Sequence, residues 1–496
     1  MCFLLNNIDK VVAKWYHISS IARAGNIGLA RKRSFIMSEG FVISEERLNS
    51  CRKAREKMRE EHLAKAAEEL GADAADALRE LLSLYDEKLY IWLAGLWQPE
   101  IGGFYHNESG RGCENMLPDI ESTGQALYFL AASGLTKGKA VDDPEAFPED
   151  FKKLVGKFAT SLLDPEDGYI YHPQWGKYIT TSRKGRDLSW ATGIYEQLGI
   201  KPPYPTAIER LSSENVEERC ELPEHLTDLE KFKAYLAKQP ISTRSYYVGN
   251  LLQAQAPQIV AAGPEYVKCL LDWIEENQRD DNGLWQEKVN YDSVNGLMKI
   301  GLLYSTCKAP IPRPDQALES ALAAALSDEP IVFVCQFYNP LVTINNILNS
   351  FVALGRIEDE KRLRARIRAL APKLIKTTYE KLKGHRVPEN GAFTYNLDRS
   401  SNGVSQGMHV GVPGLSNGGV NGTCICANGT VRGLFATLGF PRIPLYCDED
   451  ADLFFDLIRC AKVYEKTIPY PGDDVFYKGK SFFQKEIKEM KEAKAK

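Results

Sequence analysis

The sequence lacks the motifs that assign a function at first sight. It has no run of roughly 18 or more apolar residues, so no segment is predicted to span a membrane. It has no glycine-rich phosphate loop, no H-E-x-x-H zinc motif and no G-x-S-x-G nucleophile elbow. Its seven histidines are widely spread and give no set of zinc ligands. We therefore expect no metal, no cofactor and no serine-hydrolase chemistry.

An excess of positive charge is also missing. Lys and Arg number 62 and Asp and Glu 66, a formal net charge of −4. Because phosphate recognition requires a basic surface, nucleic acid is not an expected partner. The eleven cysteines are scattered and odd in number, which favours a reducing compartment and a cytoplasmic protein. The sequence predicts no particular oligomeric state.

Composition divides the chain into four segments. Residues 1–36 form a basic extension with six Lys or Arg and one acid, which is either a transit-like peptide or a misassigned start ahead of the methionine at position 37. Residues 37–74 are predicted to form a charged helical segment, and residues 75–465 the main domain. Residues 466–496 are predicted to form a tail with a charged helix.

Helical periodicity dominates the chain, with charged helices predicted over 45–70 and 74–95. Two kinds of helix then alternate. Amphipathic, charged helices are predicted over 149–163, 223–238, 264–279, 314–327, 359–383 and 449–464. Charge-poor helices rich in small residues are predicted over 119–134, 187–199, 247–263, 291–306, 340–355 and 420–438.

A helix with one charged face lies at the surface, whereas a helix with few charges all round is buried. Six outer helices alternating with six inner helices predict an all-α fold, an (α/α)6 toroid. The long connections 164–187 and 386–419 are expected to lie on one rim, where loops on a rigid scaffold carry function.

Four short turns mark this pattern, each combining an acidic residue, a glycine and an aromatic. They lie at residues 100–105, 167–171, 281–285 and 389–393. Their recurrence beside a charge-poor helix is typical of a repeat architecture. We interpret them as scaffold, with the chemistry expected at the polar helix starts that follow.

The most concentrated candidate site surrounds the start of the helix predicted over 119–134. Asp119 and Glu121 lie at this helix start, downstream of Tyr105, His106 and Arg111. Burial beside aromatic residues would raise the pKa of a carboxyl group here, as a general acid requires. Helix capping, or hydrogen bonding of a buried glutamate to backbone amides, is the structural alternative.

A second candidate cluster places His172, Trp175 and Arg186 just before Asp187. Aromatic rings beside carboxylates suit stacking against sugar faces, and they equally suit the packing of a turn. Further candidates lie at other inner-helix starts and in the rim loops: Tyr247, Asn250, Trp285, Tyr291, Asp292, Asp398, Arg399, Gln406 and His409.

Two motifs resemble those of a known superfamily. The segment WIEENQ at 273–278, followed by GLW at 283–285, resembles the QW motif of terpenoid cyclases and protein prenyltransferases, with one extra residue between the two parts. The segment DIEST at 119–123 is similar to the D-x-D-D-T motif of class II terpene cyclases, with Glu121 at the proton donor's position and serine in place of the fourth acid.

The resemblance covers roughly residues 75–465 and implies a toroid in which Glu121 donates a proton to a terpenoid. The helical organisation is also similar to that of six-hairpin glycosidases and toroid polysaccharide lyases, whose sites lie at the same rim.

The polar rim favours a hydroxylated substrate over a hydrocarbon. We therefore expect a carbohydrate-active enzyme that binds a small molecule or oligosaccharide in the toroid cavity. A glycoside hydrolase would need two carboxylates flanking the scissile bond. One would be Glu121 or Asp119. Its partner would be Asp187 or Asp292.

A uronate polysaccharide lyase is the other carbohydrate reaction. His172 and Tyr247 would serve as base and acid, with Arg186 or Asn250 neutralising the uronate carboxylate. Two alternatives remain open: a terpenoid-cyclase-like or prenyltransferase-like enzyme with Glu121 as proton donor, and a non-catalytic toroid that binds a glycan or a protein.

Overall fold

The computed structural model describes residues 36–37, 41–140, 142–143, 145–211, 223–398, 403–405 and 407–472. Helices make up 60% of the structure and strands 4%, which confirms the all-α prediction. The chain divides into two units, Met1–Ile43 and Ser44–Lys496. In the first unit, β1 (Ile36–Met37) pairs with β2 (Phe41–Val42) in antiparallel register.

Several predicted features lie outside the described residues. They are the basic extension up to residue 35, the charged helix of the tail beyond residue 472, and the side chains of Arg399 and Gln406. The boundaries proposed at residues 36, 74 and 465 stay predictions.

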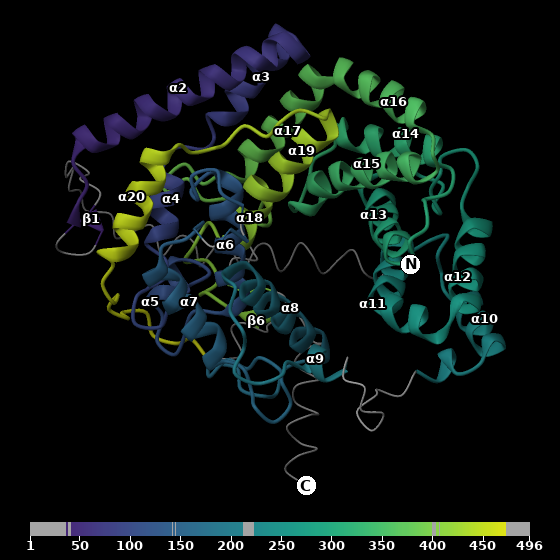
Figure 1. Cartoon of the computed structure of the whole chain (residues 1–496), viewed down its shortest axis with the longest axis horizontal. Helices are drawn as coiled ribbons and strands as arrows, with labels where there is room; N and C mark the ends of the chain where they lie inside the picture. The colour runs from purple at the N-terminus through teal and green to yellow at the C-terminus, as the bar shows by residue number, and fades with distance from the viewer. Residues whose placement is uncertain are drawn as a thin grey trace, which may run out of the picture. The chain divides into compact units, whose positions relative to one another are not determined.

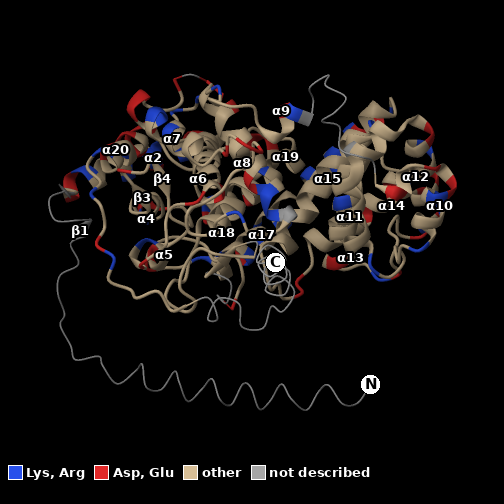
Figure 2. Ribbon diagram, turned by 90° about the horizontal axis from the view of Figure 1, so that it is seen from below, with Lys and Arg blue, Asp and Glu red and all other residues tan. Residues whose placement is uncertain are grey.

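The described part of the second unit contains the six predicted inner segments. They are α6 (Ile120–Ser133), α8 (Thr181–Leu198), α11 (Ser245–Ala262), α13 (Tyr291–Thr306), α15 (Cys335–Ala353) and the continuous run of α18 (Val420–Cys424), η3 (Ile425–Val431) and α19 (Arg432–Leu438). All but α8 are poor in charge; α8 carries five charged residues, because it begins earlier than predicted. Asp, Glu, Lys and Arg are absent from α15, α18 and η3, as Figure 2 shows by their tan ribbons.

The remaining helices carry most of the charge (Figure 2). They are α2 (Glu45–Leu70), α3 (Ala72–Leu82), α4 (Glu87–Ala94), α5 (Glu108–Gly112), α7 (Glu149–Ser161), α9 (Ala207–Leu211), η2 (Glu224–Leu226), α10 (Leu229–Ala237), α12 (Pro264–Asn277), α14 (Pro314–Ala325), α16 (Ile357–Ala369), α17 (Ala371–His385) and α20 (Asp448–Arg459). Two short hairpins complete the described elements: β3 (Trp97–Gln98) with β4 (Gly103–Phe104), and β5 (Val404–Ser405) with β6 (Met408–His409).

The inner segments contact one another in series (Figure 1). Helix α8 packs on α6, α6 on α18 and η3, η3 and α19 on α15, α15 on α13, and α13 on α11. This is the neighbour order that an (α/α)6 toroid requires for five of its six inner pairs. Closure of the ring between α8 and α11, and with it the toroid, stays a prediction.

Local sequence explains where the inner helices begin and end. The Asp119 side chain accepts a hydrogen bond from the Ser122 amide and caps α6, and Thr180 caps α8 in the same way. Asn290 and Ser293 form a reciprocal capping box at the start of α13. Gly134 and Gly199 end α6 and α8 in the left-handed conformation.

The four predicted turns share one backbone feature. Their glycines have φ values of +86°, +73°, +66° and +76° at Gly102, Gly168, Gly283 and Gly391. Each of these glycines also lies close to backbone atoms of a neighbouring segment. A Cβ on Gly283, for example, would meet the backbone nitrogen of Ala317 in α14. Close backbone approach and a left-handed φ together require glycine.

The aromatic residue after the turn joins it to the inner helix. The amide of Phe104 donates to the Thr123 hydroxyl of α6, and the amide of Phe393 donates to the Thr423 hydroxyl of α18. The Phe104 ring lies 5.0 Å from the Trp97 ring, centroid to centroid. These turns are therefore structural joints, as their repetition indicated.

Three predicted helices are each divided in the structure. The helix predicted over 223–238 becomes η2 and α10, because Asp228 caps α10. The helix predicted over 74–95 ends at Leu82 as α3, and α4 starts anew because Asp86 caps it. The helix predicted over 359–383 splits into α16 and α17. Pro372 lies in the first turn of α17, where its missing N–H costs nothing, so it opens the second helix.

Two inner helices begin earlier than predicted. Helix α8 starts at Thr181 rather than at Asp187, because Thr180 and not Asp187 is its cap. Helix α15 starts at Cys335, so Pro340 lies inside it. The first difference decides how the candidate site is built, because it places Asp187 in the second turn of a helix.

No helix among the described residues has both the length and the apolar composition needed to cross a bilayer.

We predict that Gly283→Ala destabilises the protein more than Gly176→Ala does. Both glycines have a φ of +66°, but a Cβ on Gly176 meets nothing within 4 Å. The control variant, Gly176→Ala, should lose about 1 kcal/mol of unfolding free energy, because alanine is strained in the left-handed backbone conformation. Gly283→Ala should lose a further ~1–3 kcal/mol for crowding Ala317. Urea denaturation measures both, and equal losses would refute the tight joint.

Candidate functional site

The predicted residues that meet in space lie between α6 and α8. Because α8 starts at Thr181, its first two turns carry Arg183, Arg186 and Asp187. The facing turn of α6 carries Glu121, which is 2% exposed. Arg183 and Asp187 are 2% and 0% exposed, so three of these four charged groups are inside the protein.

Two arginines neutralise the Glu121 carboxylate. Arg186 binds it in a two-point contact, with Nε 2.8 Å from Oε2 and Nη2 2.5 Å from Oε1. Arg183 Nη1 donates to Oε2 over 2.9 Å. Gln125, one turn along α6, donates to Oε1 over 3.1 Å. Such charge-assisted, two-point pairs are the strong class of hydrogen bonds.

Arg183 also binds Asp187, one turn later on its own helix. Its Nε lies 3.0 Å from Oδ2 and its Nη2 2.6 Å from Oδ1. The guanidinium therefore bridges carboxylates from two helices. Burial alone would lower the pKa of Arg183, but Asp187 and Glu121 raise it. It is therefore a permanent buried cation.

The two carboxyl groups have opposite pKa shifts. Burial opposes ionisation of Glu121, yet the hydrogen bonds and charges of Arg186 and Arg183 hold its pKa below the usual value. Burial is the main cause that raises the pKa of Asp187 to about 7. Arg183 lowers this pKa, and the negative charges of Asp119 and Glu121 offset part of that lowering. Glu121 is thus an anion and a poor proton donor, whereas Asp187 titrates near neutrality.

His172 connects this cluster to the start of α6. Its Nε2 accepts a hydrogen bond from the Ile120 amide over 2.9 Å, so the ring proton is on Nδ1. Nδ1 lies 3.7 Å from Asp187 Oδ2. Burial holds the pKa of His172 well below its usual value, so the ring is neutral. The Trp175 ring contacts His172 in a tilted arrangement with a centroid distance of 4.4 Å and also lies under Arg183.

His106 and Asp119 complete the start of α6. His106 Nδ1 is 3.3 Å from the Ser122 hydroxyl, and burial lowers the pKa of His106 to about 4. Burial raises the pKa of Asp119, although the cap hydrogen bond to Ser122 and the charge of Arg183 oppose this. The capping interpretation of Asp119 is confirmed by its bond to the Ser122 amide.

Three more predicted residues lie on the outer side of this cluster. The His409 carbonyl accepts a hydrogen bond from Trp175 Nε1 over 3.3 Å. The Tyr105 ring lies 5.0 Å from the Lys466 ammonium, and Arg111 stacks over Tyr464 at 4.1 Å. These contacts pack the C-terminal segment against the loop before α6.

The other predicted residues lie on α11, on α13 and in their loops. Trp285 is buried and donates to the Ile274 carbonyl over 2.8 Å, and Tyr291 donates to the Glu329 carbonyl over 3.1 Å. Asp292 is exposed and accepts from Gln286 at 3.5 Å. Tyr247 and Asn250 are exposed on α11, and Asp398 is exposed in the loop that follows α17. The structure thus separates the predicted residues into two groups.

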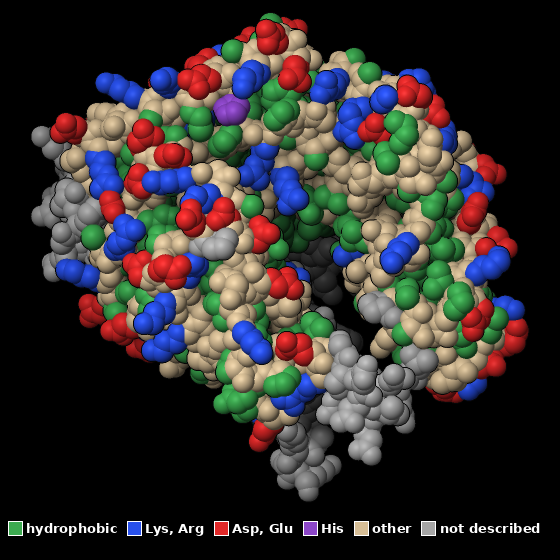
Figure 3. All heavy atoms as spheres, viewed as in Figure 1, with side chains coloured by type: hydrophobic (Ala, Val, Ile, Leu, Met, Phe, Trp, Pro, Cys, Tyr) green, Lys and Arg blue, Asp and Glu red, His purple; other side chains and the backbone are tan. Residues whose placement is uncertain are grey.

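A cavity of about 290 Å³ lies further along α6 and α8, about two turns beyond Glu121 on α6 and one turn beyond Arg186 on α8. Sequence reasoning missed the residues that line it. They come from α6, α8, α15, α18 and η3 and include Tyr128, Ser189, Trp190, Tyr338, Cys424 and Asn428. In the space-filling view, hydrophobic side chains cover much of the visible surface between the inner helices of the second unit (Figure 3).

Glycines make room for the aromatic walls of this cavity. A Cβ on Gly124 of α6 would lie 2.6 Å from the Trp190 ring, and one on Gly429 of η3 would lie 2.8 Å from the Tyr338 ring. The Tyr128 and Trp190 rings meet edge to face, with centroids 5.8 Å apart. Glycines inside charge-poor helices were the available signal for this cavity.

The segment η3 is a π-helical turn, a rare form that occurs often at functional sites. It brings Asn428 to the cavity wall. The side-chain oxygen of Asn428 is buried and has no hydrogen-bond partner. An unpaired buried acceptor destabilises the protein by about 1–3 kcal/mol unless a ligand satisfies it.

No family model, curated protein or solved structure matches this chain. The resemblance to terpenoid cyclases and prenyltransferases therefore stays a prediction. Among the described residues, no group of three or more His, Cys, Asp or Glu side chains is placed to hold a metal ion.

The raised pKa of Asp187 predicts a pH-dependent stability. Between pH 3.8 and about 7 the folded protein binds this proton more tightly than the unfolded chain does. The contribution of Asp187 is therefore largest below this window and is lost as pH rises through it. The Asp187→Asn variant has no proton to lose at this position. Its free energy of unfolding, relative to that of the parent, should therefore rise across the window by up to a few kcal/mol, at about 1.4 kcal/mol per pKa unit.

Asp292→Asn, on the exposed face of α13, is the matched control and should run parallel to the parent. Urea denaturation at a series of pH values measures all three proteins. If the Asp187→Asn curve also ran parallel, Asp187 would not be the group that titrates in this window.

Proposed function

We propose that the protein is a carbohydrate-active enzyme that binds one sugar ring in the cavity between α6, α8, α15 and η3. The observation that carries this proposal is the wall of three aromatic rings, Tyr128, Trp190 and Tyr338, around about 290 Å³. Flat aromatic faces stack on the apolar faces of sugar rings, and a pocket with a few placed polar groups is the usual form of a small-molecule site.

The polar groups of the cavity support a hydroxylated ligand over a hydrocarbon. Ser189 and Asn428 belong to the lining, and two of the three aromatic rings carry hydroxyl groups. A ligand hydroxyl donating to the unpaired Asn428 oxygen would remove the penalty of an unsatisfied buried acceptor. A terpenoid offers no ring of hydroxyls for these groups.

The charges near the cavity favour a uronate substrate over two-carboxylate hydrolysis. None of the carboxylates in the described part of the chain lines the cavity. Glu121, the nearest candidate acid on α6, is held by two arginines. Arg186 precedes Ser189 and Trp190 by one helical turn on α8, and its side chain is 37% exposed. Its guanidinium is the cation best placed to meet a sugar carboxylate.

Trp190→Ala should weaken sugar binding on the order of tenfold or more, because it removes one stacking face. Trp273→Ala, a tryptophan on α12 away from the cavity, is the control and should bind as the parent does. Titration calorimetry with methyl glucoside, methyl glucuronoside and geraniol compares the ligand classes. Geraniol binding that depends on Trp190, with no binding of either sugar, would replace this proposal by the cyclase-like one.

Arg186→Met should weaken binding of methyl glucuronoside about tenfold and leave methyl glucoside affected much less, because the guanidinium meets only the charged sugar. Arg186→Lys should recover part of the loss. Turnover is followed on neutral and uronate oligosaccharides, by reducing ends for hydrolysis and by ultraviolet absorbance of the unsaturated product for elimination. Equal losses for both sugars would exclude Arg186 from carboxylate recognition.

A further inference from the structure

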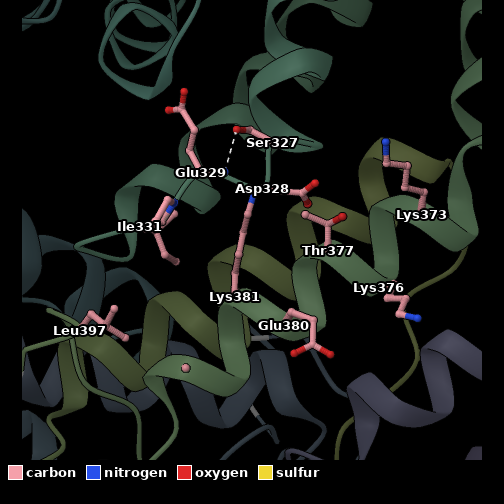
Figure 4. A pocket seen from close by; sticks show the side chains of 12 residues that line it. Ser327, Asp328, Glu329, Ile331, Lys373, Lys376, Thr377, Glu380, Lys381 and Leu397 are labelled. Atoms are coloured by element: carbon pink, nitrogen blue, oxygen red, sulfur yellow. Dashed lines mark hydrogen bonds between the residues drawn. The ribbon is translucent and has the colours of Figure 1, made fainter.

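A second cavity lies apart from the sugar site, between α17 and the loop that joins α14 to α15. Its volume is about 420 Å³. One wall is formed by residues 327–331 of the loop, the other by α17, and Leu397 closes one end. Figure 4 shows Lys381 reaching from α17 toward the loop at Asp328, whereas Lys376 points away.

The surroundings of Lys381 are poor for an ammonium ion. Its Nζ donates to the backbone carbonyl of Ala325 over 3.0 Å and lies 5.3 Å from the centroid of the Tyr291 ring. A neutral carbonyl and an aromatic face replace the carboxylate that buried lysines usually pair with. Burial lowers the pKa of Lys381 to about 8, and the charge of Asp328 opposes this only in part.

The net charge of the cavity does not select an anion. Lys373, Lys376 and Lys381 line it together with three acids, Asp328, Glu329 and Glu380. The feature that distinguishes the cavity is thus a single partly buried amine beside apolar surface from Ile331 and Leu397. Amines desolvated in this way act as nucleophiles toward carbonyl carbon.

We propose that Lys381 is a nucleophilic amine that binds a small aldehyde or ketone covalently, as an imine, in the cavity between α17 and the loop before α15. The lone pair of the neutral Nζ amine forms a bond to the carbonyl carbon, and one amine proton is transferred to the carbonyl oxygen to give a carbinolamine. The hydroxyl group then leaves with the second amine proton as water, and a C=N bond remains. The step is reversible and needs no oxidant or reductant.

The exposed carboxylates at the rim, Asp328 and Glu329, are the groups placed to exchange protons with solvent during this step. The apolar wall would hold the carbon skeleton of the ligand. The proposal is independent of the sugar site, because the lining of the two cavities has no residue in common.

The experiment treats the full chain with benzaldehyde and sodium cyanoborohydride, which reduces an imine to a stable amine, and locates the modified lysines by peptide mass spectrometry. At pH 7.5, Lys381 should be modified on the order of tenfold faster than the exposed Lys376, because a larger fraction of its amine is neutral. Equal rates at Lys373, Lys376 and Lys381 would overturn the proposal.

Two variants separate cavity chemistry from a merely reactive surface. Lys381→Arg keeps the positive charge and should abolish the fast modification, while Lys376→Arg should leave it unchanged. Gly384→Leu fills the cavity from α17, where an added Cβ makes ordinary contact with Leu397 at 3.5 Å. It should slow modification of Lys381 about tenfold without loss of helix by circular dichroism, and an unchanged rate would show that the cavity takes no part.

Discussion

The ion pairs of the Arg183 guanidinium are the interaction on which the contact between α6 and α8 depends, because they allow two carboxylates from neighbouring helices to be buried together. Its bonds to Glu121 of α6 and Asp187 of α8 join two helices that also meet through the Tyr128 and Trp190 rings. Removing one partner of such a buried pair destabilises a protein by roughly 3–5 kcal/mol, because the other charge is left uncompensated. The network therefore fixes the distance and rotation of α6 relative to α8. The position of these two helices in turn sets the shape of the cavity that lies further along both of them.

The same network explains why candidate catalytic residues and the candidate binding cavity are different sets. Glu121, Asp187 and His172 are almost fully buried; the two carboxylates bind Arg183, and His172 accepts from the start of α6. Tyr128, Trp190 and Tyr338 are half-buried and face an open volume. A charged cluster behind an aromatic wall is a usual way to hold that wall rigid. Arg186, which reaches from one set to the other, is the exception.

Much of the fold could be predicted from the sequence because it rests on local rules. The helix over 45–70 has the predicted bounds, and the four turns that the sequence marked as recurring each contain a glycine with a left-handed backbone. The start of α8 was missed because the cap that decides it, Thr180, is followed by Thr, Ser, Arg and Lys rather than by a first-turn acid. Placing Asp187 at the helix start hid its i,i+4 pairing with Arg183.

The site was predictable only in part, because its decisive contacts are long-range. Glu121 and Arg186 are far apart in sequence, and no periodicity links them. Asp119, by contrast, acts as the local cap that its position suggested. The cavity residues were missed since Tyr128 and Tyr338 look like core positions on charge-poor helices. The close contacts of Gly124 with the Trp190 ring and of Gly429 with the Tyr338 ring are seen only in the structure, and they show that these aromatic residues form the cavity wall.

The π-helical turn η3 has a consequence for the register of the last inner segment. A π-helical turn holds one residue more than an α-helical turn, so residues after it are rotated by about 100° relative to an uninterrupted α-helix. Asn428 and Gly429 line the cavity within this segment, and the α19 that follows it packs on α15. In segment 425–431 the number of residues, as well as their identity, therefore sets which side chains of α19 meet α15.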